Sequence, residues 1–276
     1  MNSPAIVVKI GGRALSNPGV LEHLIADIAA LLRSHRVVLV HGGGAEVTAY
    51  AARLGITSEF ADGVRMTGED EMEVVDMVLA GLVNKRIARR FQAAGLRAVG
   101  ICASDGGILT GTPVVRPDGT PSRTGRVVAR DPAFLEHVLN GGYLAVVAST
   151  FTDGDGGGLN LNADDAALEI ATILAADALL FLSDVPGILR RRGTEDAGGT
   201  PGTGTEDAPE LIRRLTPTEV ETEIGTGTIS GGMIPKVRSS VAALHAGVGT
   251  VIIGSYTEDE SLTDILAGNS GTRIEL

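Results

Sequence analysis

The sequence predicts an α/β protein, a three-layer αβα sandwich around a mainly parallel sheet. Short apolar runs rich in Val, Ile and Leu alternate along the 276 residues with longer amphipathic segments. This alternation is typical of parallel strands joined by helical crossovers. Hydrophobic residues make up 43% of the chain but aromatic residues only 3%, so the core must be aliphatic, which suits helices packed on a parallel sheet.

The apolar runs give the expected strands and the amphipathic segments the expected helices. We expect strands at residues 5–10, 36–40, 97–102, 143–148, 178–182 and 249–253. We expect helices at residues 18–34, 44–54, 69–94, 132–140, 163–175, 216–224 and 234–246. Residues 110–130 break this rhythm with Pro, Gly, Thr and Arg and predict a small β-hairpin. Residues 193–209 contain no core-forming residue and predict a flexible surface loop.

Charge and composition exclude several classes of protein. The net charge is −11 without a dense basic stretch, which argues against nucleic acid as a partner. Cys102 is the only cysteine, so an intramolecular disulfide or a cysteine metal cluster is excluded. No uncharged apolar run is long enough to span a membrane, and no secretory signal is visible. We therefore expect a soluble cytoplasmic protein that binds neither nucleic acid nor membrane.

Three glycine turns are the main functional signal. Gly11 and Gly12 follow the first expected strand, which carries Lys9, and residues 42–44 (Gly-Gly-Gly) follow the second. Residues 231–232 (Gly-Gly) precede Lys236 at the start of an expected helix. Glycine lets backbone N–H groups approach phosphate oxygens, and lysine adds a point charge. A strand-to-helix turn needs glycine in any case, but three such turns together favour a phosphorylated nucleotide.

Three further segments carry candidate side chains. Asp164 precedes an apolar helical run; alone it is better interpreted as a helix cap, and the alternative is that it holds two cations near a reacting phosphate. Arg65 lies in a turn and is either a partner for a substrate carboxylate or a surface charge. Residues 182–188 turn sharply at a strand end, where ligands of open α/β sheets bind, and are a candidate nucleotide contact.

Several common motifs are missing from the sequence. It has no G-x-x-x-x-G-K-[S/T] phosphate loop, and no G-x-G-x-x-G follows the first expected strand. Residues 41–44 (His-Gly-Gly-Gly) are similar to the oxyanion loop of esterases, but the chain lacks the G-x-S-x-G nucleophile elbow. A hydrolase would therefore lack its nucleophile.

Taken jointly, seven segments resemble the amino acid kinase family in order and spacing, over nearly the whole chain. The resemblance is to its members that phosphorylate N-acetylglutamate. It implies a single domain with the amino acid kinase fold, in which residues 1–175 bind the amino-acid substrate and residues 176–276 bind ATP. The seven segments are residues 8–12, 41–44, 62–65, 81–85, 160–164, 183–187 and 231–236.

The resemblance implies a reaction as well as a fold. The γ-phosphoryl group of ATP would pass to the side-chain carboxylate of N-acetyl-L-glutamate and give N-acetylglutamyl 5-phosphate, in arginine biosynthesis. Because this carboxylate is ionised at pH 7, catalysis reduces to positioning and charge neutralisation. We expect Mg²⁺ to arrive with ATP, since no carboxylate cluster marks a dedicated metal site.

Matching motifs carry the family's site residues onto this sequence. Lys9 and Lys236 would stabilise charge on the transferring phosphoryl group, and Asp164 would orient both lysines. The expected substrate-binding residues are Gly43, Gly44, Arg65, Asn160 and Asn162. The expected ATP-binding residues are Gly11, Gly12, Asp184, Val185, Pro186, Gly187, Ile188, Leu189, Thr228, Ile229 and Ser230.

Two rival functions and two departures from the family pattern stay open. A sister kinase acts on carrier-linked aminoadipate in lysine biosynthesis, but such relatives lack the intact Asn-x-Asn-Ala-Asp run of residues 160–164. A non-catalytic binding protein could lose Lys9, Asp164 or Lys236, and this chain has all three.

The loop at 193–209 is longer than the family's. Lys9 lies too near the start for the extra helix of arginine-inhibited hexamers, so the resemblance implies a homodimer little affected by arginine.

Overall fold

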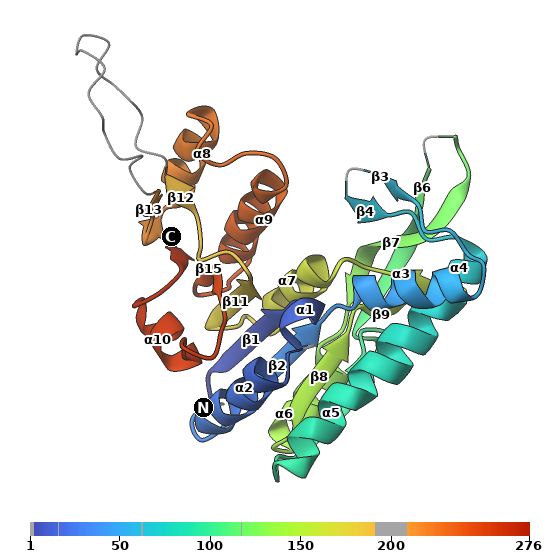
Figure 1. Cartoon of the computed structure of the whole chain (residues 1–276), viewed down its shortest axis with the longest axis horizontal. Helices are drawn as coiled ribbons and strands as arrows, with labels where there is room; N and C mark the ends of the chain where they lie inside the picture. The colour runs from blue at the N-terminus through green and yellow to red at the C-terminus, as the bar shows by residue number, and fades with distance from the viewer. Residues whose placement is uncertain (1–2, 16, 62, 117, 191–208) are drawn as a thin grey trace.

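The computed structural model describes residues 3–15, 17–61, 63–116, 118–190 and 209–276. Its main sheet has eight strands in the order β14-β16-β15-β11-β1-β2-β8-β5, and Figure 1 shows β15, β11, β1, β2 and β8. All neighbouring strands are parallel except β15 and β16, which confirms the mainly parallel sheet. The strands are β1 (Ala5–Ile10), β2 (Arg36–His41), β5 (Ala98–Cys102), β8 (Leu144–Ala148), β11 (Ala178–Ser183), β14 (Arg214–Leu215), β15 (Val251–Ser255) and β16 (Thr272–Ile274).

Helices cover both faces of this sheet, because each central strand is apolar on both sides. On one face, Val8 and Leu39 contact the first set of helices, and on the other, Val7 and Val38 contact the second. This arrangement confirms the three-layer sandwich. No helix in the described ranges is long and apolar enough to cross a membrane. The first set is α2 (Pro18–Leu31), α3 (Gly44–Arg53), α4 (Glu69–Val75), α5 (Asn84–Ala93) and α10 (Leu262–Ala267); the second is α6 (Ala133–Asn140), α7 (Ala163–Ile173), α8 (Pro217–Gly225) and α9 (Met233–His245).

The remaining elements are short and lie mostly beyond the main sheet. The predicted hairpin is confirmed as β6 and β7, which form a closed four-stranded sheet with β9 and β10. The short strands and α10 were not anticipated, since two to six residues carry little periodicity. The predicted loop at 193–209 lies outside the described residues except for Pro209. These elements are β3 (Phe60–Ala61), β4 (Val64–Arg65), β6 (Leu109–Val115), β7 (Pro121–Arg130), β9 (Thr150–Asp153), β10 (Gly158–Asn160), β12 (Leu189–Arg190), β13 (Glu210–Leu211), α1 (Gly12–Leu15) and the 3₁₀ turn η2 (Asp105–Gly107).

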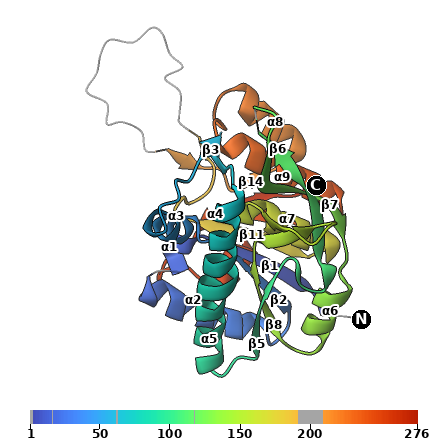
Figure 2. The ribbon, with the colours of Figure 1, turned by 90° about the vertical axis from the view of Figure 1, so that its right-hand side faces the viewer.

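The helix predicted at residues 69–94 forms, but its middle is wider than an α-helix. A π-helical segment, η1 (Asp76–Val83), joins α4 to α5, and Figure 2 shows the three as one long rod. Leu79 of this segment packs beneath the second glycine turn, where a Cβ on Gly43 would lie 2.7 Å from its Cδ2. A side chain at position 43 would therefore require Leu79 to move.

Candidate active site

A cavity of about 280 Å³ lies at the carboxyl ends of β1 and β2. The first two glycine turns form its floor, and a Cβ on Gly12 would lie 3.4 Å from the Cα of Gly43. Parallel neighbours end at the same edge, so the strand pairing of Ile10 with His41 brings the two turns together. The predicted residues that line this cavity are Lys9, Gly11, Gly12, Gly43, Gly44, Arg65, Asn160 and Asn162.

Two of the chain's three lysines meet on one carboxylate beside this cavity. The Nζ of Lys9, on β1, lies 2.8 Å from Oδ1 of Asp164, and the Nζ of Lys236, on α9, lies 2.9 Å from Oδ2. Burial is the strongest single influence on Asp164 and raises its pKa, but the two ammonium charges together outweigh it. The pKa therefore lies below its usual value. The carboxylate stays ionised at neutral pH and holds both cations in place.

The cap of α7 explains how Asp164 is free to bind the lysines. The side chain of Asn162 accepts a hydrogen bond of 2.9 Å from the backbone N–H of Asp164 and so caps the helix. The interpretation of Asp164 itself as the cap is therefore wrong. Asn162 also lines the cavity, and Asp164 binds Lys9, which lines the same cavity.

A buried histidine supports the second glycine turn, and sequence reasoning missed this role. His41 is fully buried at the end of β2; its Nδ1 lies 3.0 Å from the carbonyl oxygen of Gly42 and its Nε2 lies 3.1 Å from Nδ2 of Asn84. A proton on Nδ1 satisfies both contacts, because Nδ1 then donates and Nε2 accepts. Burial lowers the pKa of His41 to about 4, so the ring is neutral at pH 7.

We expect this histidine to make the protein less stable in mild acid. Its pKa in the folded protein is about 4, below the ordinary value of about 6.5. The unfolded chain therefore binds the proton first, and the unfolding free energy falls by on the order of 3 kcal/mol as the pH drops from about 6.5 to about 4. Urea unfolding between these pH values should show a shallower pH dependence for His41→Gln than for the wild type. Equal dependence would contradict the prediction, and His137→Gln, at an exposed position, controls for loss of a histidine.

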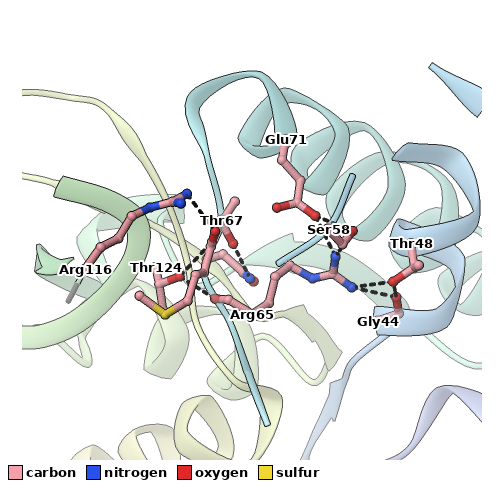
Figure 3. Close-up of polar contacts among 10 residues, drawn as sticks. Gly44, Thr48, Ser58, Arg65, Thr67, Glu71, Arg116 and Thr124 are labelled. Atoms are coloured by element: carbon pink, nitrogen blue, oxygen red, sulfur yellow. Dashed lines mark hydrogen bonds and ion pairs between the residues drawn. The ribbon is translucent and has the colours of Figure 1, made fainter. Parts of the chain in front are cut away.

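Arg65 is buried, and its side chain is bound within the protein (Figure 3). Its Nη1 donates to Ser58 Oγ at 2.5 Å and to Glu71 Oε1 at 2.6 Å. Its Nη2 donates to the Gly44 carbonyl at 2.9 Å and to Thr48 Oγ1 at 2.7 Å. Each amino group thus has as many protein acceptors as it has hydrogens. Arg65 is therefore not a surface charge. A substrate carboxylate that pairs with both of its amino groups must displace some of these contacts.

The predicted nucleotide residues divide between two environments. Gly11, Gly12 and Asp184 line a second cavity of about 590 Å³, which adjoins the first through Lys9. Residues 185–189 and 228–230 line neither of these two cavities. The side chains of Ile188 and Ile229 lie in the hydrophobic core, so a nucleotide could contact these two residues only through their backbone.

Several residues at the site were not singled out from the sequence. Thr124 of β7 and Ser149 line the first cavity together with Phe60, whose ring lies 4.8 Å from the guanidinium of Arg65. Glu71 pairs with the same guanidinium. Glu71 and Thr124 lie in elements that were predicted, but nothing local in the sequence shows that their side chains reach the site, because that depends on how these elements pack.

The sequence matches a known protein family. The profile of the amino acid kinase family matches residues 4–255, and the chain therefore belongs to that family. Its relatives include the chloroplastic acetylglutamate kinase of Arabidopsis thaliana, 37% identical over 96% of this chain and 73% of that protein. The acetylglutamate kinase of Parasynechococcus marenigrum is 40% identical over 88% of this chain and 78% of its own length. The resemblance drawn from the seven segments is confirmed.

Solved structures show the same fold. N-acetylglutamate synthase from Neisseria gonorrhoeae, complexed with coenzyme A and N-acetyl-glutamate, superposes with a TM-score of 0.80 at 28% identity. The match covers 100% of this chain and 60% of the synthase chain. Carbamate kinase from Giardia lamblia bound to AMP-PNP superposes with a TM-score of 0.67 at 17% identity, covering 99% of this chain and 98% of that one. At that identity the likeness concerns the fold alone.

Proposed function

We propose that this protein uses ATP to phosphorylate the side-chain carboxylate of N-acetyl-L-glutamate, giving N-acetylglutamyl 5-phosphate in arginine biosynthesis. The observation that carries the proposal is the pair of ion pairs from Lys9 and Lys236 to Asp164 at the edge of a glycine-floored cavity. The relatives named acetylglutamate kinase support the choice of acceptor.

The proposed reaction needs little beyond position and charge. An oxygen of the acceptor carboxylate forms a bond to the γ-phosphorus while the bond from this phosphorus to the β–γ bridging oxygen breaks, and ADP leaves. Lys9 and Lys236 neutralise charge on the transferring oxygens, while N–H groups of Gly12 and Gly44 donate to phosphoryl and substrate oxygens. The described residues contain no cluster of three metal-binding side chains, so we propose that Mg²⁺ is carried by the nucleotide and partly offsets the charge of its phosphates.

The two cavities support a division of the chain into a substrate half and a nucleotide half. The residues that line the first cavity lie between Lys9 and Ala163, within the half proposed to bind the amino acid, residues 1–175. The second cavity also involves Asp184 and residues 255–257, from the half proposed to bind ATP, residues 176–276. Lys9 borders both cavities, as a residue at the point of transfer should.

The alternatives are less well supported. A kinase of carrier-linked aminoadipate lacks the intact run that here places Asn160 and Asn162 on the cavity and Asp164 on Lys9. A non-catalytic binding protein has no need for two lysines on one carboxylate. A cytoplasmic location stays a prediction of this proposal.

The test is ATP-dependent formation of an acyl phosphate, trapped with hydroxylamine. N-acetylglutamate, glutamate, aspartate and aminoadipate should be compared at equal concentration. We expect hydroxamate from N-acetylglutamate well above that from the other three. Preference for another acceptor would change the substrate assignment, and no product with any acceptor would contradict the kinase proposal.

We also propose that the protein is a homodimer whose interface lies in the N-terminal half. Helix α3 packs on η1. Leu54, the C-cap of α3, is exposed, as are Met77 and Leu82 of η1, and exposed apolar patches often mark interfaces. Two-fold dimers are the commonest soluble assembly. Light scattering should give the mass of two chains, and Met77→Glu should shift the protein toward monomer. A stable hexamer would contradict the expected dimer, and strong inhibition of turnover by arginine would contradict the expected insensitivity to arginine.

A further inference from the structure

Thr67 is buried beside the candidate site and does not line its cavity. Its hydroxyl oxygen accepts a hydrogen bond of 3.0 Å from Nδ2 of Asn160. Asn160 does line the cavity. The two residues come from chain segments far apart in sequence, so this bond joins the segment after β4 to β10 across the side of the site.

The backbone of Thr67 is fixed as firmly as its side chain. Its N–H donates to Thr124 Oγ1 at 3.0 Å, and its carbonyl accepts from the N–H of Arg123 at 2.7 Å. The hydroxyl of Thr124 also donates to the carbonyl oxygen of Arg65. Figure 3 shows Thr67, Thr124 and Arg65 in this arrangement. Thr67 therefore has little freedom to follow a movement of Asn160.

We propose that Thr67 is a positioning residue that orients the carboxamide of Asn160 toward the amino-acid substrate. This inference rests on the proposed function, in which Asn160 and Arg65 hold the acceptor. One amide hydrogen of Asn160 is directed at Thr67, which fixes the plane of the group and leaves the second hydrogen and Oδ1 for other partners. The same segment sets the backbone of Arg65 through Thr124, so one rigid unit places both substrate-binding side chains.

The hydrogen bond from Asn160 depends on the hydroxyl of Thr67 and not on the volume of its side chain. Valine has the same branched shape but cannot accept the amide hydrogen, whereas serine keeps the oxygen. Without the oxygen of Thr67, the carboxamide of Asn160 can rotate away from the orientation that binds the substrate, and it then binds the substrate less well. Because Thr67 touches neither cavity, we expect the change to act on acceptor binding and to leave the nucleotide unaffected.

The experiment is steady-state kinetics on the full-length protein with Thr67→Val, Thr67→Ser and a matched control. Thr67→Val should raise the KM for the acceptor roughly five- to tenfold, the effect of one lost hydrogen bond. Its kcat and its KM for ATP should stay within about twofold of the wild type. Thr67→Ser should restore the KM. The control is Thr250→Val, which removes another buried hydroxyl. Thr250 Oγ1 donates to the carbonyl oxygen of Ile274. The Thr250→Val variant should leave kcat and both KM values unchanged.

A second measurement does not depend on activity. The side-chain amide signals of Asn160, assigned by their loss in Asn160→Asp, should shift in the ¹⁵N spectrum of Thr67→Val and return in Thr67→Ser. An unchanged acceptor KM in an active Thr67→Val protein, or unchanged amide signals, would overturn the proposal. If the wild type makes no acyl phosphate, the proposed function fails, and the amide signals alone decide the role of Thr67. If Thr67→Val does not fold, Thr67→Ala takes its place in both measurements.

Discussion

Replacing Lys9 or Lys236 with alanine is expected to lower kcat on the order of 100-fold or more. Both ammonium groups lie within 3 Å of Asp164, and Lys9 lines the cavity proposed as the site of phosphoryl transfer. Loss of one preorganised electrostatic group commonly lowers kcat by about this factor in an enzyme that relies on charge neutralisation. Single-turnover measurements at saturating ATP and acceptor would separate this effect from weaker binding.

The matched control for the lysine variants is Arg238→Ala. Arg238 lies on α9, like Lys236, but forms an exposed ion pair with Glu221, and it should leave kcat unchanged. A kcat within a few-fold of the wild type for Lys9→Ala or Lys236→Ala would remove that lysine from the mechanism.

The second large effect is expected on stability, from Glu71→Ala. Glu71 is 3% exposed and Arg65 8% exposed, and their ion pair is 2.6 Å long. Removing the carboxylate leaves a buried guanidinium without its counter-charge, which typically costs about 3–5 kcal/mol. Urea unfolding at pH 7 should show a loss of this size in the unfolding free energy.

Two variants define the cause of that loss. Glu73→Ala, at an exposed position on the same helix α4, should change stability by less than about 0.5 kcal/mol. Glu71→Gln keeps an oxygen that can accept from Arg65 and Ser58 and should fall between the wild type and Glu71→Ala. A Glu71→Ala protein as stable as the Glu73→Ala protein would show that the buried pair adds nothing.

The parts of the fold that could be predicted are those in which sequence pattern and local structure coincide. The central strands of the sheet contain aliphatic runs such as residues 37–40, and β1 and β2 are each followed by a glycine turn and a helix. The hairpin β6–β7 was identified by a break in that rhythm. Elements of two or three residues, such as β4 and β10, were missed because neither propensity nor periodicity can identify so short a segment.

The site was predictable where glycine and lysine marked it, and unpredictable where two distant side chains meet. Nothing local in the sequence shows that Glu71 neutralises Arg65 or that Asn84 contacts His41, since each pair depends on how two elements pack. The same limit explains the error at the start of α7. Asn162 and Asp164 are both common capping residues, and only the approach of Lys9 and Lys236 shows which one has another role.

Because Lys9 and Lys236 share the carboxylate of Asp164, their charges are brought together when the protein folds. Lys9 and Lys236 carry like charges and bind the same carboxylate, so without Asp164 they would repel one another. In the proposed reaction, Asp164 serves as a stand-in anion that keeps both ammonium groups near the position of the incoming phosphoryl group. The free energy needed to gather these charges then belongs to folding rather than to the activation barrier, and little reorganisation is left for the moment of transfer.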